Sequence, residues 1–125
     1  MTIGYFDSSA LVSIATPGDP GRRGADIWRT LDAVCALNVI EIDVPSQIGR
    51  DVDRIGWVWI VNALTLVEWT PQMHLNAIDL AWLGASTSAA MHVVCASVID
   101  ADCFVSSDPV TRSWAELQGL SVVAL

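Results

Sequence analysis

The sequence predicts a single α/β domain over residues 1–125, with three layers and a mainly parallel five-stranded sheet between helices. Short apolar runs alternate with longer segments of helical periodicity along the whole chain. Hydrophobic residues make up 53% of the sequence, which favours a sheet that helices cover on both faces. A chain of this length can also bury a substantial core within one domain.

The first predicted strand begins near Ile3 and ends at Asp7, where a helix starts at once. Ser8 or Ser9 is expected to cap that helix, although Asp7 is an alternative cap. Ligands of open α/β sheets bind at the carboxyl ends of the strands. Asp7 is therefore the first candidate site residue.

The later elements follow the same alternation. Helices are expected over 22–31, 44–64, 71–83, 86–101 and 110–118, and strands over 33–39, 64–69, 103–106 and 121–124. Pro45 is difficult to place, because proline inside a helix removes a hydrogen bond. Either the helix begins near Val44 with Pro45 in its first turn, or it is kinked at Pro45. Asn38 is expected to cap this helix.

The chain is acidic, with a net charge of −8. It therefore does not bind nucleic acid through its overall field, and any contact with RNA must be local. The cysteines have no metal-type spacing and are expected as core residues in a reducing compartment. We find no basic leader, and the uncharged stretch 80–99 is too polar for a good membrane span. We therefore expect a cytoplasmic protein with no membrane segment.

Two of the predicted strands end in the same way. The first ends at Asp7 and is followed by serines, and the strand over 103–106 is followed by Ser107 and Asp108. If these strands are close in the sheet, the two carboxylates converge, and Glu41 can point into the same crevice. Clustered carboxylates suit a hard cation such as Mg²⁺ or Mn²⁺, which can activate water for phosphodiester hydrolysis.

Residues 5–12 (YFDSSALV) and the pattern over 90–123 resemble PIN-domain ribonucleases, specifically the VapC toxins of bacterial toxin–antitoxin systems. The resemblance implies a PIN-like domain and a magnesium-dependent endoribonuclease that cleaves structured RNA such as tRNA. It also implies a homodimer and a cognate antitoxin that neutralises the toxin. By position, the resemblance implies that Asp7, Glu41 and Asp108 are the acids that hold the metal. It implies that Ser9 and Ser106 are hydroxyls beside the site, and that Arg112 is a basic residue that binds RNA.

Ala89 departs from this family pattern. The family usually carries an aspartate three residues before the histidine, which here is His92. Alanine cannot ligate a metal, so we predict that activity is lost or weakened, whether Ala89 is natural or an introduced replacement. The alternative is a non-catalytic PIN-like module that binds RNA or protein. His92 itself is expected to be a packed or surface histidine, because a metal-activated water needs no imidazole base.

Some tryptophans and arginines are candidates for contacts with a protein partner or with RNA. Trp57 and Trp59 cannot both face the core from one helix, so one of them is expected in a dimer or antitoxin contact. Arg22, Arg23 and Arg29 either contact RNA phosphates or lie on a solvated helix face, and we favour the solvated face.

Overall fold

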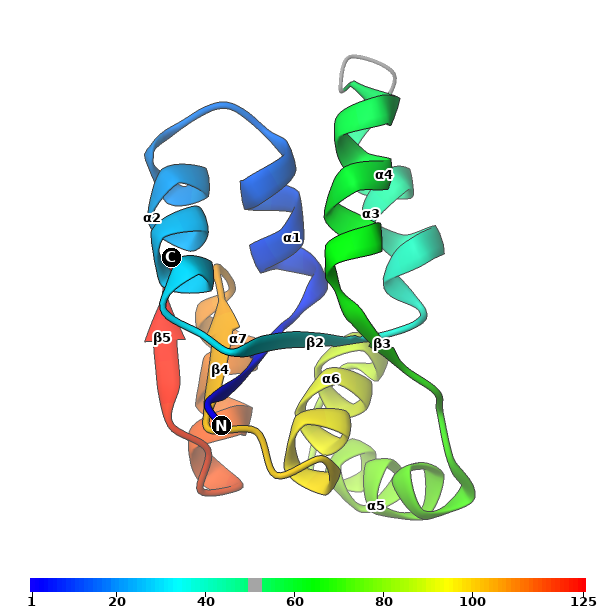
Figure 1. Cartoon of the computed structure of the whole chain (residues 1–125). Helices are drawn as coiled ribbons and strands as arrows, with labels where there is room; N and C mark the ends of the chain where they lie inside the picture. Colours follow the sequence, from blue (N-terminus) through cyan, green and yellow to red (C-terminus); the bar gives the residue numbers. More distant parts are fainter. Residues whose placement is uncertain (50–52) are drawn as a thin grey trace.

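The computed structural model describes residues 1–49 and 53–125, and within them it has seven helices and five strands. In chain order they are β1 (Ile3–Phe6), α1 (Ser8–Ala15), α2 (Asp19–Arg29), β2 (Ala33–Leu37), α3 (Ile40–Ile48), α4 (Arg54–Ala63), β3 (Thr65–Val67), α5 (Pro71–Trp82), α6 (Thr87–Val98), β4 (Cys103–Ser106), α7 (Pro109–Leu117) and β5 (Val122–Ala124). Helices α1 to α4 cover one face of the sheet and α5 to α7 cover the other (Figure 1). The predicted three-layer α/β/α class is confirmed.

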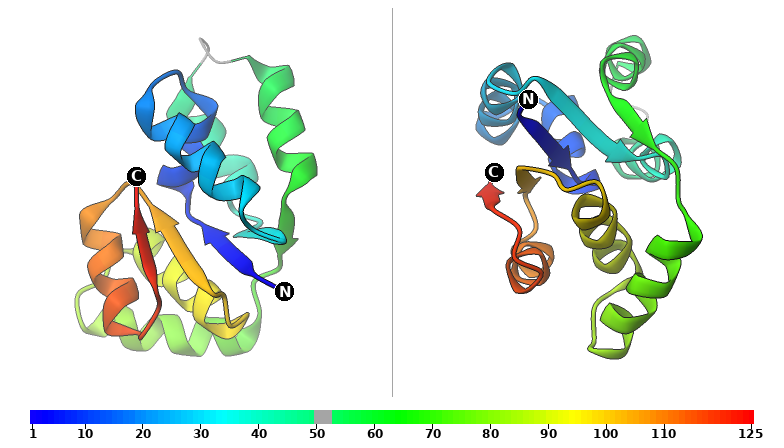
Figure 2. Two further views of the ribbon diagram at one scale, coloured as in Figure 1. Left: turned by 60° about the vertical axis from the view of Figure 1, so that its left-hand side comes forward. Right: turned by 60° about the horizontal axis from the view of Figure 1, so that its bottom comes forward.

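The five strands form one parallel sheet in the order β3-β2-β1-β4-β5. β1 is therefore the central strand, and Gly4 pairs with Val34 of β2 and with Cys103 of β4. Figure 2 shows β1, β4 and β5 running side by side in the same direction. Since all carboxyl ends lie at one edge, the residues that follow β1 and β4 come together there.

β1 separates two hydrophobic cores, because successive strand residues point to opposite faces. Tyr5 is fully buried in the core beneath α5 to α7, where its ring stacks on Phe104 with centroids 5.5 Å apart. Phe6 is fully buried in the core beneath α1 to α4, where its ring meets Trp28 edge-on. The first strand thus anchors both layers.

The predicted long helix over 44–64 is wrong. The structure has two helices here, and α3 begins early enough that Pro45 lies inside it. Gly49 follows α3 with φ of 69°, a conformation that glycine adopts without strain. Asp53 then caps α4 by accepting the backbone N–H two residues ahead. Residues 50–52, which the predicted helix also included, lie outside the described residues.

Several smaller expectations change. The cap of α3 is Val39, which makes no side-chain cap bond, so the predicted Asn38 cap is wrong. α2 begins three residues earlier than expected, with Pro20 in its first turn, and α6 ends at Val98 rather than near 101. Trp57 is 7% exposed and Trp59 is 73% exposed, so only one of the pair faces the core, as predicted.

The helices in the described part of the chain are all too short or too polar to span a bilayer.

Candidate functional site

Asp7 is a buried carboxylate, 3% exposed, at the carboxyl end of the central strand. Its Oδ1 accepts hydrogen bonds from the backbone N–H of Ala10 at 2.9 Å and from Ser9 Oγ at 2.7 Å. Its Oδ2 accepts a hydrogen bond from Ser106 Oγ at 2.6 Å. Asp7 therefore caps α1 itself, and the expectation that Ser8 or Ser9 caps this helix is wrong.

Ser106 joins the ends of the adjacent strands β1 and β4. Its fully buried hydroxyl donates to Asp7 and accepts a hydrogen bond from the backbone N–H of Asp108 at 3.0 Å. Ser9 Oγ lies 3.1 Å from Ser106 Oγ and accepts the backbone N–H of Ser107 at 2.9 Å. The two strand endings that look alike in the sequence thus share one hydrogen-bond network.

Asp108 caps α7 much as Asp7 caps α1. Its Oδ1 accepts the backbone N–H of Val110 at 3.1 Å, and its Oδ2 accepts the hydroxyl of Thr111 at 2.7 Å. Arg112, one turn into α7, donates from its guanidinium to the carbonyl of Ser106 at 3.0 Å. A cationic group is therefore held at the end of β4.

Glu41 lies apart from this network. Its side chain is exposed and lines a cavity of about 730 Å³ between α3 and α4, together with Arg54 and Trp57. The hydrogen bonds that hold Asp7 do not include it. The structure therefore gives no contact that brings Glu41 to the strand ends.

Asp43 is the acid of α3 that the sequence reasoning missed. It is half-buried, and its neighbours Ile40 and Val44 are both fully buried. Burial lowers the pKa of His92, and the negative charges of Asp7 and Asp43 oppose that shift. The signal available in the sequence was the pair of apolar residues Ile40 and Val44, which lie one helical turn apart. Residue 43 adjoins the face that they form.

The donor atoms present do not fit a resident metal ion. Within residues 1–49 and 53–125, no three His, Cys, Asp or Glu side chains lie together in a way that could hold one. Asp7 Oδ1 accepts two hydrogen bonds from the protein, whereas Asp7 Oδ2 and the two carboxylate oxygens of Asp108 accept one each. Ala89, 1% exposed in the first turn of α6, offers no ligand. No chemical step is therefore assigned to magnesium in the chain as it stands.

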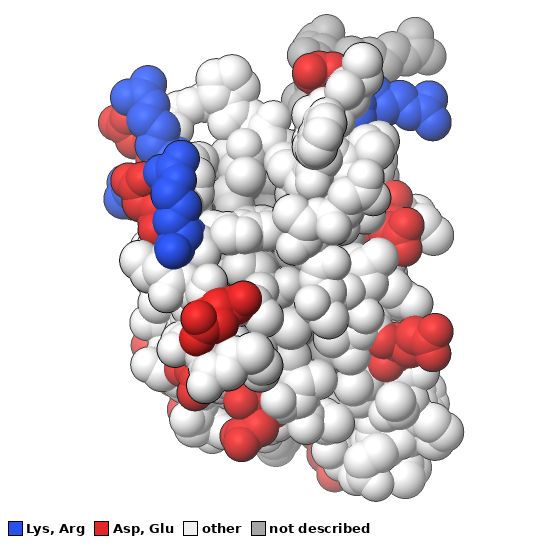
Figure 3. Space-filling model, viewed as in Figure 1, with Lys and Arg blue, Asp and Glu red and all other residues white. Residues whose placement is uncertain are grey.

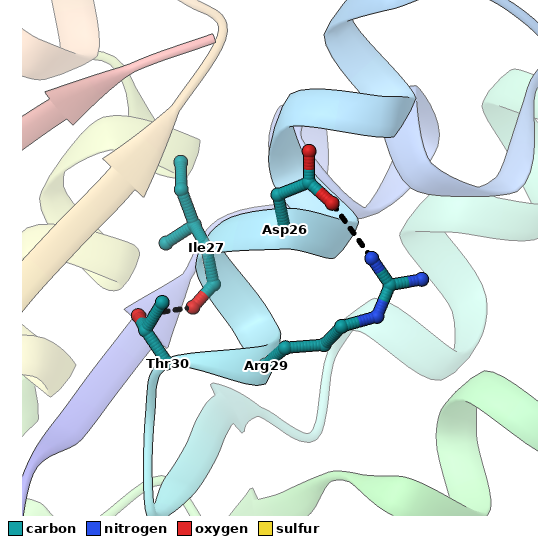
Figure 4. A network of polar contacts seen from close by, with 4 residues as sticks. All are labelled: Asp26, Ile27, Arg29 and Thr30. Atoms are coloured by element: carbon teal, nitrogen blue, oxygen red, sulfur yellow. Dashed lines mark hydrogen bonds and ion pairs between the residues drawn. The ribbon is translucent and has the colours of Figure 1, made fainter.

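Two of the three arginines of α2, Arg22 and Arg29, pair with aspartates of the same helix. Arg29 donates to Asp26 Oδ1 at 2.6 Å, as Figure 4 shows, and Arg22 lies 3.4 Å from Asp19. Both pairs are largely exposed. Figure 3 shows basic and acidic side chains next to one another over the region of α2. This arrangement supports the solvated helix face over a phosphate-binding surface.

No protein-family model matches the sequence, and no curated protein matches it. Solved structures do resemble the fold. The crystal structure of PAE2754 from Pyrobaculum aerophilum aligns over 98% of this chain and 90% of its own, with a TM-score of 0.63 and 15% sequence identity. At that identity the likeness shows the fold alone.

Proposed function

We propose that this chain is a VapC-like toxin of the PIN-domain ribonuclease family whose hydrolytic centre is incomplete, so that it cleaves RNA weakly or not at all. The observation that carries the proposal is the serine-bridged pair of aspartates at the carboxyl ends of the two adjacent strands β1 and β4. Asp7 and Asp108 are the family-matched acids there, and Arg112 adds a cation suited to a phosphate of RNA.

Ala89 accounts for the incomplete centre. It lies in the first turn of α6, one turn before His92, and His92 contacts Ser8, the residue that follows Asp7. An aspartate at position 89 would therefore add a carboxylate on the helix that packs against the end of β1. In the resembling family such a set of acids holds Mg²⁺, which activates water and neutralises charge on the phosphoryl group.

The proposal includes RNA and protein partners. The substrate is a structured RNA such as tRNA, met in the cytoplasm. A homodimer and an antitoxin would cover apolar surface, and α4 exposes Ile55, Val58 and Trp59. A basic side chain of the antitoxin would suit a chain of net charge −8.

One observation favours a second candidate, a non-catalytic PIN-like module. Each aspartate at the strand ends uses its Oδ1 to cap a helix, and position 89 has no acid. Such a chain keeps the fold and binds RNA or protein without hydrolysis.

The test is cleavage of a total RNA pool in the presence of magnesium, by the chain and by its Ala89→Asp variant purified in the same way. Ala89→Asn is the matched control, because it has nearly the same shape and no carboxylate. Cleavage by the aspartate variant alone supports the proposal. If that variant is folded by circular dichroism but does not cut with Mg²⁺ or Mn²⁺, the ribonuclease proposal fails and RNA binding by the chain becomes the measurement to make.

A further inference from the structure

A buried chain of hydrogen bonds runs from β2 to the start of α1. The backbone N–H of Leu37 donates to Tyr5 Oη at 3.1 Å, and Tyr5 Oη lies 2.6 Å from His92 Nδ1. On the other side of the ring, His92 Nε2 lies 2.9 Å from Ser8 Oγ. Tyr5, His92 and Ser8 are all buried, so no solvent-exposed group takes part.

The neighbours of His92 determine which way its hydrogen bonds run. Tyr5 accepts the N–H of Leu37, so its own O–H is free to donate to Nδ1. Burial raises the pKa of Tyr5 and lowers that of His92, so the phenol keeps its proton and the imidazole is neutral. When Tyr5 donates to Nδ1, the ring proton is on Nε2 and is donated to Ser8.

The Ser8–His92 pair has the spacing of a nucleophile and its base, yet it cannot act as one. Ser8 is 4% exposed and His92 is 2% exposed, so a substrate atom cannot reach the hydroxyl. The contact must instead act on what Ser8 is attached to. Ser8 is the first residue of α1 and directly follows Asp7.

We propose that His92 is a positioning residue that holds Ser8, and thereby the Asp7 carboxylate, in place against α6. The role given to Asp7 rests on the proposed function, whereas the hydrogen-bond chain does not. Ser106 of β4 holds Asp7 from one side, and His92 of α6 holds it through Ser8 from the other. Because Ala89 lies one turn before His92 on the same helix, this contact also sets the separation between residues 7 and 89.

Two amide substitutions separate the two hydrogen bonds of the ring. In His92→Gln the amide nitrogen reaches the place of Nε2 and can donate to Ser8. In His92→Asn the amide oxygen stands near the place of Nδ1 and can accept from Tyr5, while the contact with Ser8 is lost. The pair therefore differs in the contact that the proposal depends on, with similar chemistry in the core.

The readout is amide hydrogen exchange by NMR at Ala10, whose N–H is bonded to Asp7 Oδ1. The control is Val110, whose N–H is bonded to Asp108 Oδ1 at the start of α7. We expect about tenfold faster exchange at Ala10 in His92→Asn, as for the loss of one hydrogen bond, and little change in the glutamine variant. Unchanged exchange at Ala10 in the asparagine variant, or equal acceleration at both amides, would overturn the proposal.

A second arm places the same pair in the Ala89→Asp background and measures RNA cleavage. We expect the asparagine variant to cut about tenfold more slowly than the glutamine variant, since groups that orient a site typically change its performance by that order. If the Ala89→Asp parent cuts nothing, the proposed function fails, and the exchange at Ala10 still decides the role of His92.

Discussion

Replacing Ser106 with alanine removes the hydroxyl that bridges the ends of β1 and β4. The side chain is fully buried, so water cannot replace it. Asp7 Oδ2 loses its donor at 2.6 Å, and the N–H of Asp108 loses its acceptor at 3.0 Å. A hydrogen bond to a charged group contributes about 1.5–3 kcal/mol and a neutral one about 1 kcal/mol. We therefore expect Ser106→Ala to lower the free energy of unfolding by about 3 kcal/mol.

The assay is urea unfolding, followed by tryptophan fluorescence and circular dichroism so that two-state behaviour is checked. The midpoint should fall by about 1.5 M for a slope near 2 kcal/mol/M. Ser113→Ala is the matched control, because this exposed hydroxyl donates only to the carbonyl of Pro109 within α7, and we expect a loss of less than about 0.5 kcal/mol. Equal losses in the two variants would refute the reasoning that the bridge stabilises the strand ends.

Gly21→Ala should destabilise the fold by about 2 kcal/mol in thermal unfolding, because an added Cβ would overlap a backbone oxygen of α1. Gly56→Ala, with room for the methyl group in α4, should be neutral or stabilising by up to about 1 kcal/mol. The unfolding free energy should fall as the pH drops below about 6.5, because His92 binds a proton in the unfolded state but stays neutral when it is buried in the folded state. His92→Gln should reduce the dependence of the unfolding free energy on pH in this range. Asp43→Asn should lower the pKa of His92 in an NMR titration, whereas Glu41→Gln should leave it unchanged.

Each of these outcomes has a clear opposite. A Gly21→Ala protein as stable as Gly56→Ala would mean that α1 and α2 separate without cost. An unchanged pH slope in His92→Gln would assign the acid sensitivity to other groups. A lower His92 pKa in Glu41→Gln would place Glu41, rather than Asp43, beside the imidazole.

The sequence predicts the sheet and the two strand endings well because these features are local. An apolar run that stops at Asp7 and another that stops before Asp108 are visible without any knowledge of packing. Their convergence depended on β1 and β4 being neighbours, which only the sheet order decides. That pairing places Ser106, at the end of β4, close to Asp7, which directly follows β1, and the hydroxyl of Ser106 reaches the Asp7 carboxylate.

Helix α3 shows why the rest could not be predicted. Apolar periodicity continues through α3 and α4, so it does not mark the break between them. Gly49 and Asp53 are nevertheless common residue types at the end and at the start of a helix. Starting the helix four residues late also hides which side of it is buried. Ile40 and Val44 both face the core. With α3 oriented in this way, the charge of Asp43, not that of Glu41, acts on the pKa of His92.

The position of β1 at the centre of the sheet has a consequence for how the protein is made. Ser106, the hydrogen-bond partner of Asp7, emerges from the ribosome 99 residues after it. At the usual speed of translation this is a delay of about 5–20 s. Throughout that interval the growing chain holds one half of the aspartate–serine network without the other. The network of the candidate site can therefore assemble only after β4 has followed β1 out of the ribosome.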